Sequence, residues 1–158
     1  MSTSPPSPPP IESVPGYRLA EAAAWWALSR RAADVVILDL RGRSDACDFF
    51  VLATGTVETQ VRAIVDAVGD GLARRGDRPH HVEGMQSGRW GLLDYLDVVV
   101  HVFQPQPREY YNLERLWSDA PRFAISDEFF ADPAVRARHP WLAEAPDAPC
   151  PPTSPGRS

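Results

Sequence analysis

Two acidic residues beside an apolar strand are the first candidates for chemistry in this sequence. Asp94 and Asp97 directly precede the run Val98–Phe103. Metal-dependent nucleotidyl transfer needs carboxylates that converge on Mg²⁺, and on a strand the simplest pair is Asp-x-Asp, because side chains two positions apart share a face. The sequence has no acidic-x-acidic triplet, so a site here would need a bend or a third carboxylate such as Asp39 or Asp48. The spacing therefore favours a turn that Asp94 orders and a strand that Asp97 opens.

The other reactive residue types also lack the spacing of known sites. The Thr-Gly-Thr loop at 54–56 could offer backbone N–H groups to a phosphate, but it matches neither a dinucleotide-binding loop nor a P-loop, and a tight turn capped by Thr56 is favoured. His101 lies among valines and is expected to be half-buried with a hydrogen-bond partner. Cys47 is expected to be a small packing residue. The sequence thus predicts no enzyme, with no catalytic residue, metal ligand or cofactor.

Aromatic residues are the strongest remaining signal. Trp and Tyr are favoured as interface anchors because they offer a large contact area at a small loss of rotamer entropy. Trp26 and Trp117 are expected in the core, because each lies on the apolar side of a predicted helix. Trp90 lies between Arg89 and Gly91, and this context favours an exposed recognition role and a core role about equally.

Hydrophobic periodicity predicts the elements that position these residues. The order is α-β-β-α-β-β-β-α, which predicts an α/β fold with three layers, a mixed sheet flanked by helices. The expected elements are a helix at 17–31, strands at 35–40 and 49–53, a helix from Thr56 to Gly76, an extended piece at 79–83, a strand and turn within 89–97, a strand at 98–103, and a short helix with Tyr110, Leu113 and Trp117 on one side.

Proline divides the chain into three parts. Residues 1–16 form a Pro/Ser-rich N-terminal tail that is predicted to be disordered, since it offers little apolar area to bury. Residues 17–121 are predicted to form one domain. Residues 122–158 hold seven prolines and are predicted to be a largely disordered C-terminal extension, some of whose apolar groups dock on the domain.

Composition limits the partners and the location. The chain has 158 residues, a net charge of −5 and no Lys, so it lacks the overall basic field that holds nucleic acid. No apolar run reaches the roughly 18 residues that a membrane span needs. Cys47 and Cys150 form no disulfide or zinc pattern. These features predict a cytoplasmic protein with no membrane partner and no direct sequence-specific nucleic-acid binding.

Four motifs occur in a fixed order along residues 17–121. They are Asp48–Thr56 (DFFVLATGT), Arg89–Tyr95 (RWGLLDY), Asp97–Phe103 (DVVVHVF) and Tyr110–Pro121 (YYNLERLWSDAP). Each is modest alone, but in this order they closely resemble the motifs of the ribosomal silencing factor family, also called the Iojap-like family.

The resemblance implies a nucleotidyltransferase-like α/β fold without the transferase active site. It implies a translational repressor that binds the large ribosomal subunit, through the protein numbered fourteen on its intersubunit face, and blocks joining of the small subunit when nutrients are scarce. A bacterial location is favoured over an organellar one. The partner-binding candidates implied by the resemblance, with Trp90 and Tyr95 as anchors, are Trp90, Leu92, Leu93, Asp94, Tyr95 and Leu96.

One position departs from the family pattern. Relatives usually carry Gly between the Tyr and Asp of this motif, where this chain has Leu96. Gly adopts a positive φ without steric cost and Leu does not, so either the turn has another geometry or Leu96 adds apolar contact area. Some relatives are homodimeric, and the sequence leaves a homodimer open. Two alternative functions also stay open: a Mg²⁺-dependent nucleotidyltransferase built on Asp94, and a dimeric adaptor whose proline-rich tails recruit partners.

Overall fold

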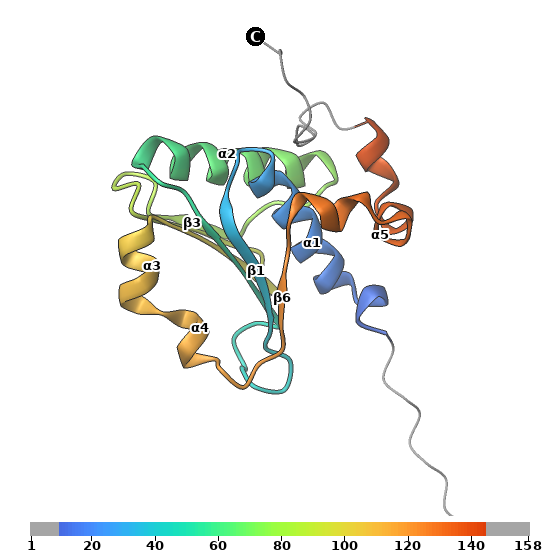
Figure 1. Ribbon diagram of the computed structural model, residues 1–158, viewed down its shortest axis with the longest axis horizontal. Helices are drawn as coiled ribbons and strands as arrows, with labels where there is room; N and C mark the ends of the chain where they lie inside the picture. Colours follow the sequence, from blue (N-terminus) through green and yellow to red (C-terminus); the bar gives the residue numbers. More distant parts are fainter. Residues whose placement is uncertain (1–9, 145–158) are drawn as a thin grey trace, which may run out of the picture.

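Six strands form one mixed sheet in the computed structural model, which describes residues 10–144 (Figure 1). The strands lie in the order β3, β4, β5, β2, β1, β6. Among them only β2 and β5 are parallel neighbours. The bounds are β1 Ala33–Asp39, β2 Phe49–Thr54, β3 His81–Glu83, β4 Trp90–Asp94, β5 Val98–Phe103 and β6 Arg122–Ala124. The mixed sheet confirms the predicted α/β class.

Helices lie on both faces of the sheet. Figure 1 shows α1 on one side, with α5 beyond it, and α3 and α4 on the other side. The α-helices are α1 Pro15–Leu28, α2 Glu58–Arg74, α3 Pro105–Tyr111, α4 Leu113–Leu116 and α5 Pro133–Arg138, and the 3-10 helices are η1 Ile11–Ser13, η2 Asp127–Ala131 and η3 Pro140–Glu144. Within residues 10–144 no helix is long and apolar enough to cross a membrane.

Strand alternation separates two hydrophobic clusters, one on each face of the sheet. In β5, Val98, Val100 and Val102 belong to the cluster under α1 and α2, whereas Phe103 belongs to the cluster on the other side. We call the face under α1 and α2 the closed face and the face toward α3 and α4 the open face. Trp26, predicted to be a core residue, is buried on the closed face.

The start of α2 differs from the prediction. The helix begins at Glu58, and Thr56 does not cap it; Val57 holds the cap position in an extended conformation. Gln60 turns back instead, and its side-chain oxygen accepts hydrogen bonds from the Thr56 backbone N–H at 2.7 Å and from the Thr56 hydroxyl at 3.0 Å. The predicted cap by Thr56 is therefore wrong, and a side chain from inside the helix instead bonds to Thr56.

The end of α2 follows the prediction. Gly76 has a φ of +91°, and its N–H bonds to the Ala73 carbonyl, while the Asp77 N–H bonds to the Leu72 carbonyl. This pair of bonds is the Schellman arrangement, which needs a left-handed residue and hence favours Gly.

The segment 122–144 was predicted to be largely disordered, and the structure corrects this. Strand β6 pairs antiparallel with β1, and Phe130, Val135 and Leu142 enter the closed-face cluster. Residues 1–16 were also predicted to be disordered. This is wrong for residues 11–16, which contain η1 and the first residues of α1. Residues 1–9 and 145–158, also predicted to be disordered, lie outside the described residues.

A buried ion cluster holds the C-terminal segment against α1. Glu21 is fully buried, and its carboxylate accepts hydrogen bonds from Arg138 at 2.6 and 3.1 Å and lies 2.9 Å from His139 Nε2. Burial opposes ionisation of Glu21, but the hydrogen bonds from His139 and Arg138 outweigh it and keep the pKa of Glu21 below its usual range. Sequence patterning does not reveal this cluster because its members are more than 110 residues apart.

The predicted short helix after β5 is broken in two. Asn112 adopts a left-handed conformation, with a φ of +44°, between α3 and α4. Its side chain then accepts a hydrogen bond from the Arg115 N–H at 3.2 Å. Because of this break, Leu113 and Trp117 pack partly buried against the open-face cluster, whereas Tyr110 is exposed.

Candidate partner-binding surface

Alternation along β4 divides the six candidate residues between the two faces. Trp90, Leu92 and Asp94 are partly exposed and lie on the open face. Leu93 and Tyr95 are buried in the closed-face cluster, at 2% and 7% exposure. Leu93 and Tyr95 therefore offer a partner little surface in this conformation, and the binding role of the six residues stays a prediction. The physical reason is the period of two along a strand.

Trp90 is held in place by its neighbours on the open face. Its indole N–H donates a hydrogen bond to Nδ1 of His101 at 3.1 Å. Its ring centroid lies 4.9 Å from that of Phe103 and 4.7 Å from that of Tyr111. Contacts at this separation are favourable for aromatic pairs. The ring is thus fixed in orientation while part of it stays exposed.

His101 is the buried residue that accepts the hydrogen bond from Trp90. It is buried at 5% exposure, which is deeper than the predicted half-buried position, and it has the predicted hydrogen-bond partner. Burial lowers the pKa of His101 to about 4, so the ring is neutral at neutral pH. A neutral ring that accepts at Nδ1 carries its proton on Nε2, which has no partner among the described residues.

Aromatic side chains from α3 extend the exposed area beside Trp90. Tyr111 is 52% exposed and Tyr110 is 81% exposed, and their ring centroids lie 5.0 Å apart. Neither tyrosine was among the candidates from sequence, although two adjacent tyrosines in a helix that follows a strand were a usable signal. We define the contact surface as the open-face set that these side chains complete: Trp90, Leu92, Asp94, Leu96, Tyr110 and Tyr111.

A small hollow adjoins this surface. It has a volume of about 190 Å³ and is lined by Glu83, Gly84, Trp90 and Leu92. Gly84 has a φ of +81°, and a Cβ at this position would overlap the backbone of Trp90. Gly84 therefore allows the loop after β3 to approach β4 closely, which shapes the hollow.

The turn between β4 and β5 contains a left-handed residue, a conformation that favours glycine, but the residue is Leu96. Leu96 has a φ of +72°, and its N–H donates to Oδ1 of Asp94 at 2.8 Å. The Leu96 side chain is 55% exposed at the tip of the turn. Leu96 therefore adds apolar contact area in the left-handed geometry, and Asp94 orders the turn as predicted.

Carboxylates gather at this end of the sheet without forming a metal site. Burial first, and then the charges of Asp48, Asp94 and Asp97, raise the pKa of the Cys47 thiol to about 11. Cys47 is buried, in agreement with its predicted packing role. Across residues 10–144 no three His, Cys, Asp or Glu side chains come together in a way that could hold a metal ion. This end of the sheet therefore presents an acidic, partly apolar surface.

Comparison with known proteins identifies a family that resembles this chain. The family model described as "Ribosomal silencing factor during starvation" matches residues 13–147. A ribosomal silencing factor from Bacillus subtilis is 44% identical over 92 residues, which cover 58% of this chain and 78% of that protein. The chloroplastic protein Iojap of Zea mays is 32% identical over 90 residues, covering 57% of this chain and 39% of that protein.

Solved structures extend the similarity to the fold. A crystal structure of a protein from Chromobacterium violaceum superposes with a TM-score of 0.65 and 32% identity, covering 72% of this chain and 95% of that chain. The family match includes β6 and the C-terminal segment that docks on α1, and therefore extends beyond the predicted domain 17–121. The chain belongs to the ribosomal silencing factor family.

Proposed function

We propose that this protein lowers translation during starvation by binding the large ribosomal subunit through its contact surface, so that the small subunit cannot join. The proposed docking site is the ribosomal protein numbered fourteen on the intersubunit face. Membership of the ribosomal silencing factor family supports the activity. The single observation that supports the surface is Trp90, whose partly exposed ring is held by His101, Phe103 and Tyr111.

A fixed aromatic ring suits an interface anchor. Side chains that are already ordered lose little entropy on binding, so more of the contact energy remains as affinity. The hollow beside Trp90 gives a side chain of the partner a place to enter, and anchors paired with pockets carry much of the energy of an interface.

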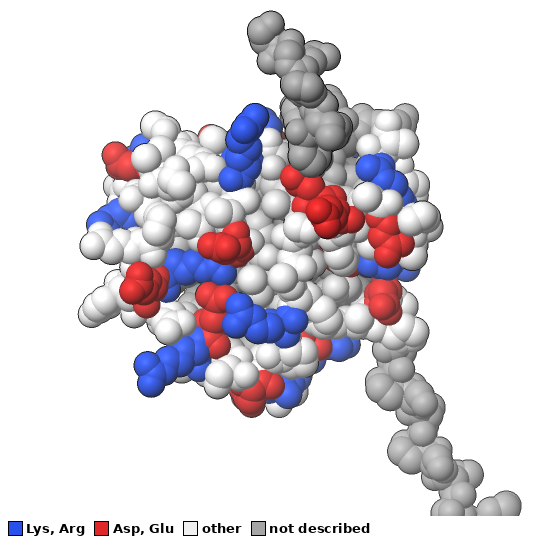
Figure 2. All heavy atoms as spheres, viewed as in Figure 1, with Lys and Arg blue, Asp and Glu red and all other residues white. Residues whose placement is uncertain are grey.

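Charge favours a basic protein as the partner. The chain has a net charge of −5, and Asp48, Asp94 and Asp97 lie at the Leu96 end of the contact surface. Opposite charges raise the association rate and fix the register of an interface. Figure 2 shows Arg side chains interspersed with Asp and Glu on the face in view, without the one-sign basic patch that direct nucleic-acid binding favours.

The proposed mechanism is occupancy and involves no chemical step or cofactor. Because the protein acts only by covering a surface, its effect depends on affinity and on concentration. We place it in the cytoplasm of a bacterium, by analogy with its bacterial relatives. The nucleotidyltransferase-like class of the fold stays a prediction.

Sedimentation of mixed ribosomal subunits tests the activity. Saturating protein is expected to shift fully joined ribosomes to separate subunits, and an unchanged profile would contradict the proposal. Tyr111→Ala tests the surface, because a half-exposed side chain can be removed with little effect on the fold. We expect weaker large-subunit binding, by about 1 to 2 kcal/mol or roughly 5- to 30-fold, with an unchanged melting temperature.

Two exposed apolar residues give a matched control. Leu96 and Val57 are 55% and 53% exposed, but only Leu96 belongs to the contact surface. A photo-crosslinking residue at position 96 is expected to form adducts with the protein numbered fourteen on purified large subunits, whereas one at position 57 is not. Equal yields from both positions would contradict this docking site.

A further inference from the structure

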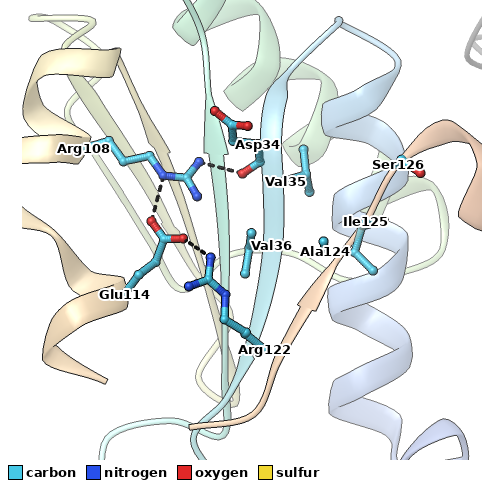
Figure 3. Close-up of a pocket in the computed structure, with 9 residues that line it drawn as sticks. All are labelled: Asp34, Val35, Val36, Arg108, Glu114, Arg122, Ala124, Ile125 and Ser126. Carbon is cyan, nitrogen blue, oxygen red and sulfur yellow. Dashed lines mark hydrogen bonds and ion pairs between the residues drawn. The ribbon is translucent and has the colours of Figure 1, made fainter. Parts of the chain in front are cut away.

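A second and larger hollow lies apart from the contact surface. It has a volume of about 530 Å³ and is bounded by α3 and α4 on one side and by β1 and β6 on the other (Figure 3). Pockets that hold small molecules commonly have volumes of about 300 to 1,000 Å³. Its lining residues are Asp34, Val35, Val36, Arg108, Glu114, Arg122, Ala124, Ile125 and Ser126.

Two guanidinium groups share one carboxylate at one end of this hollow. Glu114 accepts a hydrogen bond from Arg108 at 3.2 Å with one oxygen and from Arg122 at 2.6 Å with the other. Figure 3 shows both guanidinium groups reaching toward the same space, with Glu114 on one side of it and Val36 on the other. Within this trio two guanidinium groups face one carboxylate, and the carboxylate of Asp34, at the edge of the hollow, balances the remaining charge.

Arg108 is fixed rather than mobile. Its Nη1 also donates to the Asp34 carbonyl at 2.6 Å and to the Thr54 hydroxyl at 2.8 Å, and its side chain is only 11% exposed. Arg122, in contrast, is 58% exposed and is anchored only by Glu114 among the described residues. A fixed guanidinium beside an accessible one presents forked donors that match the oxygens of a phosphate.

The rest of the hollow fits something larger than a bare anion. Val36, Ala124 and Ile125 offer apolar surface next to the charged end, and Asp34 and Ser126 offer polar groups at its edge. The hollow also adjoins Thr54, at the carboxyl end of the parallel strand β2, where open α/β sheets commonly bind ligands. An acidic edge residue can accept a hydrogen bond from a sugar hydroxyl, as it does in dinucleotide sites.

We propose that this hollow binds a phosphate-bearing small molecule of nucleotide size. The phosphate lies between Arg108 and Arg122, and the remainder lies over Val36, Ala124 and Ile125. This binding is separate from ribosome binding, because the hollow shares no residue with the contact surface. Either proposal can therefore fail without the other.

Calorimetric titration of the full chain tests the site, with AMP, inorganic phosphate and citrate as probes. We expect saturable binding of AMP, with weaker binding of phosphate and of citrate. Arg122→Ala is expected to weaken AMP binding about tenfold, since it removes charge-assisted hydrogen bonds. Arg115→Ala, an exposed arginine next to Glu114 in sequence but outside the lining, is the matched control and is expected to bind as the wild type does.

Glu114→Gln is expected to strengthen AMP binding, whereas Arg122→Ala weakens it. It removes the carboxylate that competes with the ligand, so AMP is expected to bind several-fold more tightly. Amide shifts on adding AMP should centre on Val36 and on residues 124–126. Absence of heat and of shifts at about 10 mM AMP, unchanged affinity in Arg122→Ala, or citrate binding as tightly as AMP would each overturn the proposal.

Discussion

The two faces of the sheet differ in how they are covered, and the difference separates stability from recognition. The closed face lies under α1 and α2, and α1 is buried almost along its whole length because the C-terminal segment covers its outer side. The open face is covered only in part by α3 and α4, which leaves Trp90 and Tyr111 accessible. A helix that is apolar on all sides is typical of a core. We therefore expect closed-face substitutions to change stability and open-face substitutions to change binding.

Removal of Glu21 should have the largest effect. Glu21→Ala leaves the buried His139 and the half-buried Arg138 without their carboxylate, and breaking a buried ion pair in this way costs about 3 to 5 kcal/mol. Urea unfolding monitored by Trp fluorescence measures the loss. Glu58→Ala breaks an exposed pair with Arg62 and should change the free energy of unfolding by less than about 1 kcal/mol. A loss from Glu21→Ala as small as that of the control would contradict the closed-face assignment.

Acidification should destabilise the fold through His101, the buried histidine of the open face. The pKa of His101 is about 4 in the folded protein and about 6.5 in an unfolded chain. Between these values the unfolded chain binds the proton and the folded protein does not, so stability falls as pH falls from about 6.5 to 4. At pH 4.5 this contribution is about 2 to 3 kcal/mol.

The His101 contribution can be isolated by comparing two proteins at two pH values. Wild type and His101→Gln are unfolded in urea at pH 7 and at pH 4.5. The wild type should lose about 2 to 3 kcal/mol more than the variant on acidification. Equal losses would mean that His101 takes up its proton without unfolding.

Substitution of two glycines of α2 by alanine should change stability in opposite directions. A Cβ at Gly71 would overlap the ring of Trp26, whereas a Cβ at Gly69 would meet Leu93 at an ordinary 3.5 Å. Gly71→Ala should therefore destabilise by about 1 to 3 kcal/mol through overpacking. Gly69→Ala should stabilise by up to about 1 kcal/mol through helix propensity. Thermal unfolding of both variants checks the pair, and a stabilised Gly71→Ala would show that α2 leaves room for a side chain beside Trp26.

Leu96→Gly should change stability the least. It should stabilise the fold slightly and weaken binding to the large subunit. The left-handed conformation costs a non-glycine residue about 1 to 2 kcal/mol, and part of that is regained when Gly replaces Leu. The variant should be more stable by up to about 1 kcal/mol but bind the large subunit more weakly, since it loses an exposed apolar side chain. Leu96→Ala is the control, because it loses the side chain and keeps the strain.

Local pattern predicted those parts of the fold that depend on neighbours in sequence. The alternation of β5 and the helical spacing of α2 carry their own signal, because one face of each is buried. The three-residue strand β6 is too short to show a pattern, and only its pairing with β1 makes it a strand. Glu21 looks like a surface residue in sequence, because its partners Arg138 and His139 are distant along the chain.

The contact surface was predictable in part. Trp90 was selected from its residue type and context, the motif implied its neighbours, and their binding role stays a prediction. The period of two along β4 predicts that Leu93 and Tyr95 lie on the opposite face of the sheet from Trp90. The resemblance instead implied one surface that includes all three residues. The position of Tyr111 beside Trp90 could not be predicted from sequence, because the contact joins α3 to β4, two elements that are not adjacent in sequence.

The ion pair between Glu21 and Arg138 also sets the order in which the protein can fold during synthesis. The two residues are 117 positions apart, so at about 5 to 20 residues per second Glu21 waits roughly 6 to 23 seconds for its partner to be made. During that time α1 lacks the cover of the C-terminal segment and exposes apolar surface. Folding of the closed face is therefore expected to finish only after residue 138 has left the exit tunnel.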